Sequence, residues 1–228
     1  MRSMPLTAEQ FFGVFSTYNA SVWPWQFVLA LAAAAVALAA WRRPERASRA
    51  VPAFLAVLWI WSGVVYHLTH FARVNPAAYV FGGLFALQGV LWVWAAARER
   101  LHFRAPGGTP WTIGAIGIVY SLVIYPLLGS TLGHGYPSSP TFGAPCPSTI
   151  FTLGILLWAR PPVPMRLVAI PVLWAVLAAP AALGWGVLED LGMPLMALAA
   201  VVLLGLQNRK GRPEVGQPLP HTAAVRSR

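Results

Sequence analysis

The sequence is poor in acidic residues, has a single cysteine and lacks the short motifs of common enzymes. That cysteine, Cys146, stands alone among 228 residues, which excludes an internal disulfide and a paired-cysteine metal knuckle. Acidic residues number only six. A Walker sequence, a GxSxG elbow and an HExxH zinc motif are all missing. The motifs give no support to a nucleotide hydrolase, a serine hydrolase or a zinc protease.

Hydrophobic surface and positive charge are what the chain has in excess. Hydrophobic residues make up 57% of it, and its net charge is +10. This combination is typical of a membrane protein that carries its basic residues in loops. These residues are spread over four connectors without a groove-reading motif, so nucleic acid is not an expected partner. The expected partner is the lipid bilayer.

Hydropathy predicts an all-α fold, a polytopic bundle of about seven transmembrane helices. Crossing roughly 30 Å of hydrocarbon takes about 20 residues at 1.5 Å each. The predicted spans are residues 23–41, 50–70, 76–97, 110–128, 147–159, 164–185 and 193–206. The fifth is only about 20 Å long, so we expect it to begin below the membrane surface.

The distribution of arginine and lysine predicts the orientation of the bundle. Of the 16 basic residues, 14 follow the first, third, fifth and seventh spans. The positive-inside rule then places the N-terminus outside and the C-terminus in the cytoplasm. Residues 1–208 form the predicted transmembrane domain, and residues 209–228 form a disordered cytoplasmic tail. Thr7 and Gln10 have capping-box spacing and begin a short interfacial helix.

Two histidines near the outer end of the second span suggest a metal site. His67 and His70 are three residues apart and share a helix face. His134 and Cys146 from the fourth connector are the other candidate ligands, and this set of side chains suits zinc or copper. The alternative is that the histidines cap a helix end and face water.

The fourth connector, residues 129–147, is rich in glycine and proline but has few charged groups. One interpretation is that it folds into an outer cavity and lines a ligand site; the other is that it is a packed external lid in which Ser148 caps the next helix. Apart from Arg166 near the start of the sixth span, the spans hold no acidic or basic residue, so the usual buried coupling group of a secondary transporter is missing unless a histidine serves. The candidate ligand-binding residues are Tyr18, Asn19, Tyr66, His67, His70, Asn75, His134, Cys146, Ser148, Glu189 and Asp190.

Three blocks resemble a known family. They are FFGVFSTYN near the start, NPAAYVFGGLF in the third span and GHGYPSSPTFGAPCPSTIFTLG around the fourth connector. They resemble a family of small bacterial multi-pass membrane proteins of unknown function, whose members are often labelled permease. The resemblance implies a location in the bacterial cytoplasmic (inner) membrane and supplies no reaction.

Three functions fit the sequence. The favoured one is permease-like binding or transport of a small solute or ion through an outward-facing cavity. The second is a non-catalytic membrane sensor or partner subunit. The third is a membrane-embedded, metal-dependent hydrolase with Glu189 or Asp190 as base. The missing catalytic motifs favour a protein that is not an enzyme.

Overall fold

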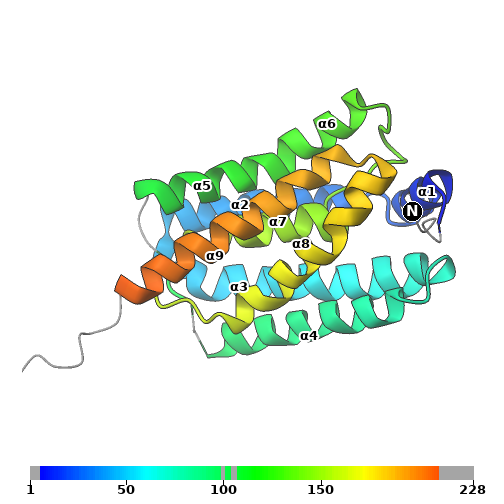
Figure 1. The fold of residues 1–228 in the computed structure, drawn as a ribbon. Helices are drawn as coiled ribbons and strands as arrows, with labels where there is room; N and C mark the ends of the chain where they lie inside the picture. Colours follow the sequence, from blue (N-terminus) through cyan, green and yellow to red (C-terminus); the bar gives the residue numbers. More distant parts are fainter. Residues whose placement is uncertain (1–5, 99–100, 104–106, 211–228) are drawn as a thin grey trace, which may run out of the picture.

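The computed structural model describes residues 6–98, 101–103 and 107–210, which form an all-α bundle. No strand occurs in these residues beyond two isolated β-bridges. The long helices run roughly along one axis, and a short helix, α1 (Ala8–Ser21), lies across one end (Figure 1). We call this end of the bundle the α1 end. The all-α prediction is confirmed.

Six helical segments of the described chain are long and apolar enough to cross a membrane. Large apolar side chains such as Leu31, Val80 and Leu195 are more than 60% exposed on them. This is the surface expected of helices that face lipid rather than water. Three of these segments are the single helices α2 (Trp25–Arg42), α4 (Ala78–Ala97) and α8 (Arg166–Trp185). The other three join consecutive elements: α3 (Pro44–Trp61) with η1 (Ser62–His70) and η2 (Phe71–Arg73), α5 (Gly108–Val119) with η3 (Tyr120–Ile124) and α6 (Tyr125–Thr131), and η4 (Leu188–Leu191) with α9 (Gly192–Lys210).

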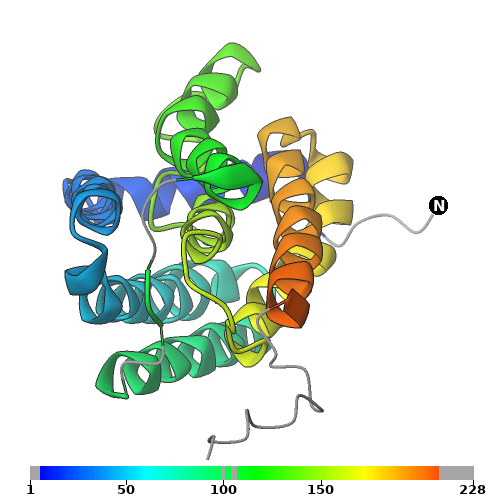
Figure 2. The ribbon, with the colours of Figure 1, turned by 90° about the vertical axis from the view of Figure 1, so that its left-hand side faces the viewer.

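A seventh apolar helix, α7 (Pro145–Leu156), is too short to belong to this set. Its 12 residues reach about 18 Å at 1.5 Å each, and every one of them is buried. Viewed down the bundle, α7 occupies the centre and the long helices surround it (Figure 2). The expectation of a shortened fifth helix that starts near Cys146 is confirmed.

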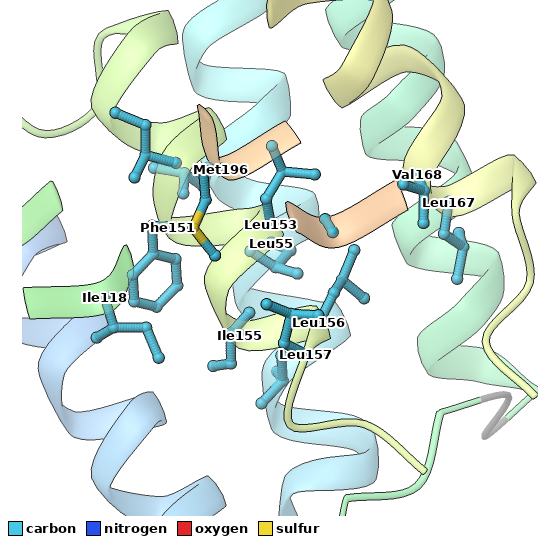
Figure 3. Close-up of a cluster of buried hydrophobic side chains, with 14 of the residues drawn as sticks. Leu55, Ile118, Phe151, Leu153, Ile155, Leu156, Leu157, Leu167, Val168 and Met196 are labelled. Atoms are coloured by element: carbon cyan, nitrogen blue, oxygen red, sulfur yellow. The ribbon is translucent and has the colours of Figure 1, made fainter. Parts of the chain in front are cut away.

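Close backbone contacts hold α7 in place. A Cβ on Gly154 would lie 2.9 Å from the carbonyl oxygen of Gly114, so only glycine permits this approach of α7 to α5. On its other sides α7 contributes Phe151, Leu153 and Ile155 to a core that also draws on α3, α5, α8 and α9 (Figure 3). The central helix is therefore a packed core element.

Basic residues gather at the end of the bundle opposite α1. Arg98, Arg160 and Arg166 line one surface depression together with His102. The guanidinium of Arg166 also lies 4.3 Å from the ring centre of Trp94. The segregation of charge that underlies the predicted orientation is thus visible in the fold, while the sidedness in the cell stays a prediction.

The structure tests the predicted N-terminal helix fully but the predicted C-terminal tail only at its first two residues. At the start, the capping box is confirmed, since Thr7 Oγ1 accepts from the Gln10 amide at 3.2 Å and Gln10 Oε1 accepts from the Thr7 amide at 3.0 Å. The helix that follows buries Phe15 and Tyr18 against the bundle. At the other end, α9 (Gly192–Lys210) continues two residues beyond the predicted boundary, and residues 211–228 of the expected tail lie outside the described chain.

Candidate functional site

A cavity of about 170 Å³ opens at the α1 end, and aromatic rings form most of its wall. The rings come from α1, η1, η2, α4 and α8, so elements far apart in the sequence converge there. We call this space the aromatic cavity; it is lined by Phe11, Phe15, Tyr66, Phe71, Phe81, Trp174, Trp185, Leu177, Ala178, Ala181 and Pro145, with Asn75, Cys146 and Asp190 as its polar members.

The rings are packed against one another as well as around the space. Phe11 stacks on Trp185 with 4.0 Å between ring centres, and Phe15 stacks on Tyr66 at 5.4 Å. Tyr66 in turn stacks on Phe71 at 5.9 Å. Such contacts fix the rings in place, so the cavity wall is preorganised.

Asp190, the only aspartate of the chain, reaches the cavity from a connector that turns inward. After α8 the chain adopts a left-handed conformation at Gly186, with φ of 76°, and then forms the short 3-10 helix η4 (Leu188–Leu191). This turn leaves Asp190 only 4% exposed and Glu189 only 1% exposed. The turn thus carries both carboxyl groups, which are candidate ligand residues by sequence, into the bundle.

Neutral donors hold the Asp190 carboxyl. The Tyr125 hydroxyl donates to its Oδ1, and the Cys146 thiol makes a second side-chain interaction with it. Within the part of the chain that the structure describes, Asp190 forms no ion pair. Its carboxyl group therefore has hydrogen bonds but no ion-pair partner among the described residues, and His134 acts on it only from beyond ion-pair distance.

Glu189, one residue earlier, has a different environment. His134 Nε2 lies 2.8 Å from its Oε1 and 3.0 Å from its Oε2. The imidazole also packs against the Phe12 ring at 4.9 Å between centres. A protonated His134 would balance the Glu189 charge in this geometry. His134 thus pairs with Glu189 and not with the adjacent Asp190.

Three of the four expected metal ligands are held by separate partners. His70 contacts the Ser21 hydroxyl at 2.9 Å through Nε2 and the Val65 carbonyl at 2.7 Å through Nδ1. His134 pairs with Glu189, and Cys146 interacts with Asp190. In the described residues no group of three or more His, Cys, Asp or Glu is placed to hold a metal ion. The geometry gives the metal hypothesis no support.

His67, the remaining member of that set, is enclosed by rings. It is fully buried, and neither ring nitrogen has a hydrogen-bond partner among the described residues. Phe85 and Trp174 are the nearest rings, at 4.7 and 5.1 Å between centres. His67 lies in η1 (Ser62–His70), a π-helical segment of the kind often found at functional sites. His67 is not among the residues that line the aromatic cavity; it packs behind them.

Asn19 binds the connector at residues 132–144, whereas the Tyr18 hydroxyl contacts α3. Asn19 Nδ2 donates to the carbonyl oxygens of Pro137 at 2.6 Å and Ser139 at 2.8 Å, and Asn19 Oδ1 accepts from the Thr141 hydroxyl at 2.6 Å. The Tyr18 hydroxyl accepts from Trp61 Nε1 at 2.9 Å, and burial raises the pKa of Tyr18. These contacts agree with the packed-lid interpretation of the connector.

The last part of that connector descends toward α7. The Ser62 hydroxyl donates to the Gly143 carbonyl at 2.7 Å, and Gly143 has φ of 101°. Helix α7 then starts with Ala144 as its cap residue, so Ser148 is not the cap that the sequence suggested. Ser148 is buried instead, and its hydroxyl has no partner among the described residues.

Four of the eleven expected ligand residues line the aromatic cavity: Tyr66, Asn75, Cys146 and Asp190. Sequence reasoning missed the Tyr125 hydroxyl and most of the aromatic wall. The crowding of Phe11 and Phe15 on one face of the first helix was the available signal for that wall. Nothing local signals Tyr125, since it lies in an uninterrupted apolar run.

Comparison with known proteins adds a family but no activity. Residues 8–214 match a family of unknown function, DUF6064. The chain belongs to this family. No curated protein and no solved structure matches it. Any assignment of DUF6064 function must therefore come from the site itself.

Proposed function

We propose that this DUF6064 protein is a permease-like membrane protein that binds a small, largely apolar solute in the aromatic cavity. The observation that carries the proposal is a preorganised ring-lined space with one buried carboxyl group in its lining. Apolar walls with a few convergent polar groups are the usual form of a small-molecule site. In this proposal, the aromatic cavity at the α1 end serves as the outward-facing cavity that the sequence favours.

The size of the cavity limits the solute. An apolar cavity of about 150 Å³ accommodates a benzene molecule. The aromatic cavity, at about 170 Å³, is suited to a molecule of similar size with one small polar substituent. Sugars, nucleotides and peptides exceed this volume. The solute class is thus a compact one, with an apolar body and a single polar end.

A substitution that enlarges a lining side chain, and so fills part of the aromatic cavity, tests whether the solute binds there. Ala181 lines it from α8, so Ala181→Leu should occupy part of the space and weaken binding of a benzene-sized probe at least about tenfold. Ala169, exposed on the same helix, provides the matched control, since Ala169→Leu adds the same atoms to the lipid-facing surface. Intrinsic tryptophan fluorescence reports binding, because Trp174 and Trp185 line the cavity.

Phenol, titrated into purified protein in lipid nanodiscs, is a suitable first probe. The proposal expects a saturable fluorescence change in the natural chain and in Ala169→Leu that is lost in Ala181→Leu. A linear, non-saturating response that is identical in all three proteins would overturn it. Uptake into proteoliposomes then separates a permease from a binding protein that does not transport.

A further inference from the structure

The charge balance of the aromatic cavity defines its ligand more narrowly. Asp190 is buried, accepts from the Tyr125 hydroxyl and interacts with the Cys146 thiol, but no cationic side chain of the described chain pairs with it. The neighbouring acid, Glu189, already takes the one nearby basic group, His134. A buried carboxylate without a countercharge is costly, so either a proton or a bound cation must balance it.

The wall of the cavity favours an organic cation over other charged ligands. The faces of aromatic rings carry negative electrostatic potential and attract ammonium groups. Phe15, Tyr66 and Trp174 line the same cavity as Asp190. An anion would meet these rings and an acidic group, and the lining contains no arginine or lysine. The start of α7 also lies in the wall, but Pro145 and Pro147 have no N–H group to offer an anion there.

A metal ion fits the cavity poorly. Hard cations need several oxygen ligands, and zinc needs about four ligands in all. The lining supplies one carboxyl group, one thiol and the Asn75 amide among its apolar residues. A metal would have to keep most of its water in a space surrounded by rings. An ammonium group with an apolar substituent satisfies both the carboxyl group and the rings.

We infer that the ligand is a small organic ammonium ion whose charged nitrogen pairs with Asp190 and whose apolar body packs against the aromatic wall. This inference rests on the proposed function, since it names the ligand class of the same cavity. Tyr125 then acts as a positioning residue that holds the Asp190 carboxylate through Oδ1.

A series of three probes of one shape tests the charge requirement. Benzylammonium, benzyl alcohol and benzoate share a phenyl ring and differ in the charge of the substituent. In the natural chain, benzylammonium should bind at least about tenfold more tightly than benzyl alcohol, and benzoate should not bind. The measurement is tryptophan fluorescence in nanodiscs, with Ala181→Leu as the background for partition into lipid.

Two matched variants locate the effect at one carboxyl group. Asp190→Asn should reduce the preference for benzylammonium over benzyl alcohol to about twofold or less while benzyl alcohol still binds, which shows that the cavity is intact. Glu189→Gln removes the adjacent acid and should keep the preference, because that acid is paired with His134.

Equal binding of benzylammonium and benzyl alcohol to the natural chain would overturn the ammonium assignment and leave the proposed cavity in place. Loss of the preference in Glu189→Gln but not in Asp190→Asn would also overturn it. Absence of saturable binding by every probe, phenol included, would instead reject the proposed function. The comparison of benzylammonium with benzyl alcohol is made in the natural chain, so this test of the ammonium assignment does not depend on how well a charge variant folds.

Discussion

The Asn19 side chain clamps the connector at residues 132–144, and its removal has a calculable effect. Asn19 makes three hydrogen bonds to that connector, between 2.6 and 2.8 Å long, and is fully buried. At a net value of about 1 kcal/mol each, Asn19→Ala should lower the free energy of opening the connector by about 3 kcal/mol. Since 1.4 kcal/mol is about a factor of ten, the open population should rise about a hundredfold.

Amide hydrogen exchange in nanodiscs measures this opening directly. The Ser138 amide donates to the Gly135 carbonyl at 2.9 Å, and the Ala144 amide donates to the Thr141 carbonyl at 2.9 Å. Both amides should exchange about a hundredfold faster in Asn19→Ala when exchange is limited by the opening equilibrium. The peptide covering residues 138–144 contains both reporters.

Asn208 offers a matched control at the opposite end of the bundle. It makes a similar clamp, with its Nδ2 donating to the Val163 carbonyl and its Oδ1 accepting from the Val163 amide, both at 2.8 Å. Asn208→Ala should speed exchange at Val163 and leave residues 138–144 unchanged. If Asn19→Ala changed exchange of residues 138–144 less than about threefold, the clamp would be energetically unimportant and the reasoning refuted.

Two further predictions concern packing and charge. Gly154→Val should prevent stable folding, because its Cβ would lie 2.9 Å from a backbone oxygen that cannot move. Gly205 has open space around it, so Gly205→Ala should fold normally. Thermal unfolding in detergent compares the two variants, and equal unfolding midpoints would contradict the packing of α7 against α5. His134→Ala should lower the free energy of unfolding by about 3 kcal/mol, because it leaves Glu189 buried and unpaired. Adding Glu189→Gln to this variant should restore part of the lost free energy. Chemical denaturation of the two single variants and the double variant measures the coupling between His134 and Glu189. If the two single changes in unfolding free energy simply add in the double variant, the pair is not coupled.

The long apolar helices could be predicted from the sequence because apolar length is a local property. A run of about 20 apolar residues must satisfy its own backbone, so it forms a helix whatever surrounds it. The short fifth helix was also predictable, since Pro145 and Pro147 mark its start within a glycine- and proline-rich stretch. The same local signals identified the capping box at Thr7.

The cavity could not be predicted in the same way, because it depends on contacts between distant segments. Phe11 and Trp185 stack although they are far apart in the sequence, and no periodicity links them. Gln88 illustrates the opposite case, since its bond to the Leu167 carbonyl at 3.1 Å is the interhelical contact that an isolated polar residue in a span suggests. A polar residue in a span signals that it has a partner, whereas an aromatic residue there carries no comparable signal.

Glu189 and Asp190 are candidate site residues by sequence, but their burial could not be predicted from it. Two adjacent acids after an apolar span usually indicate a hydrated loop, because burying both costs too much without partners. The left-handed turn at Gly186 changes that balance by bringing the first acid to His134 and the second to Tyr125.

The two carboxyl groups then have distinct physical roles. Glu189 is paired with His134, so its interaction is complete within the fold and contributes to holding the connector that carries His134. Among the described residues Asp190 has hydrogen bonds but no ion-pair partner, and it lines a space bounded by rings. Under the proposed ammonium binding, Asp190 is the group that pairs with the bound cation. The proposal thus assigns structural support to Glu189 and ligand recognition to Asp190, the next residue.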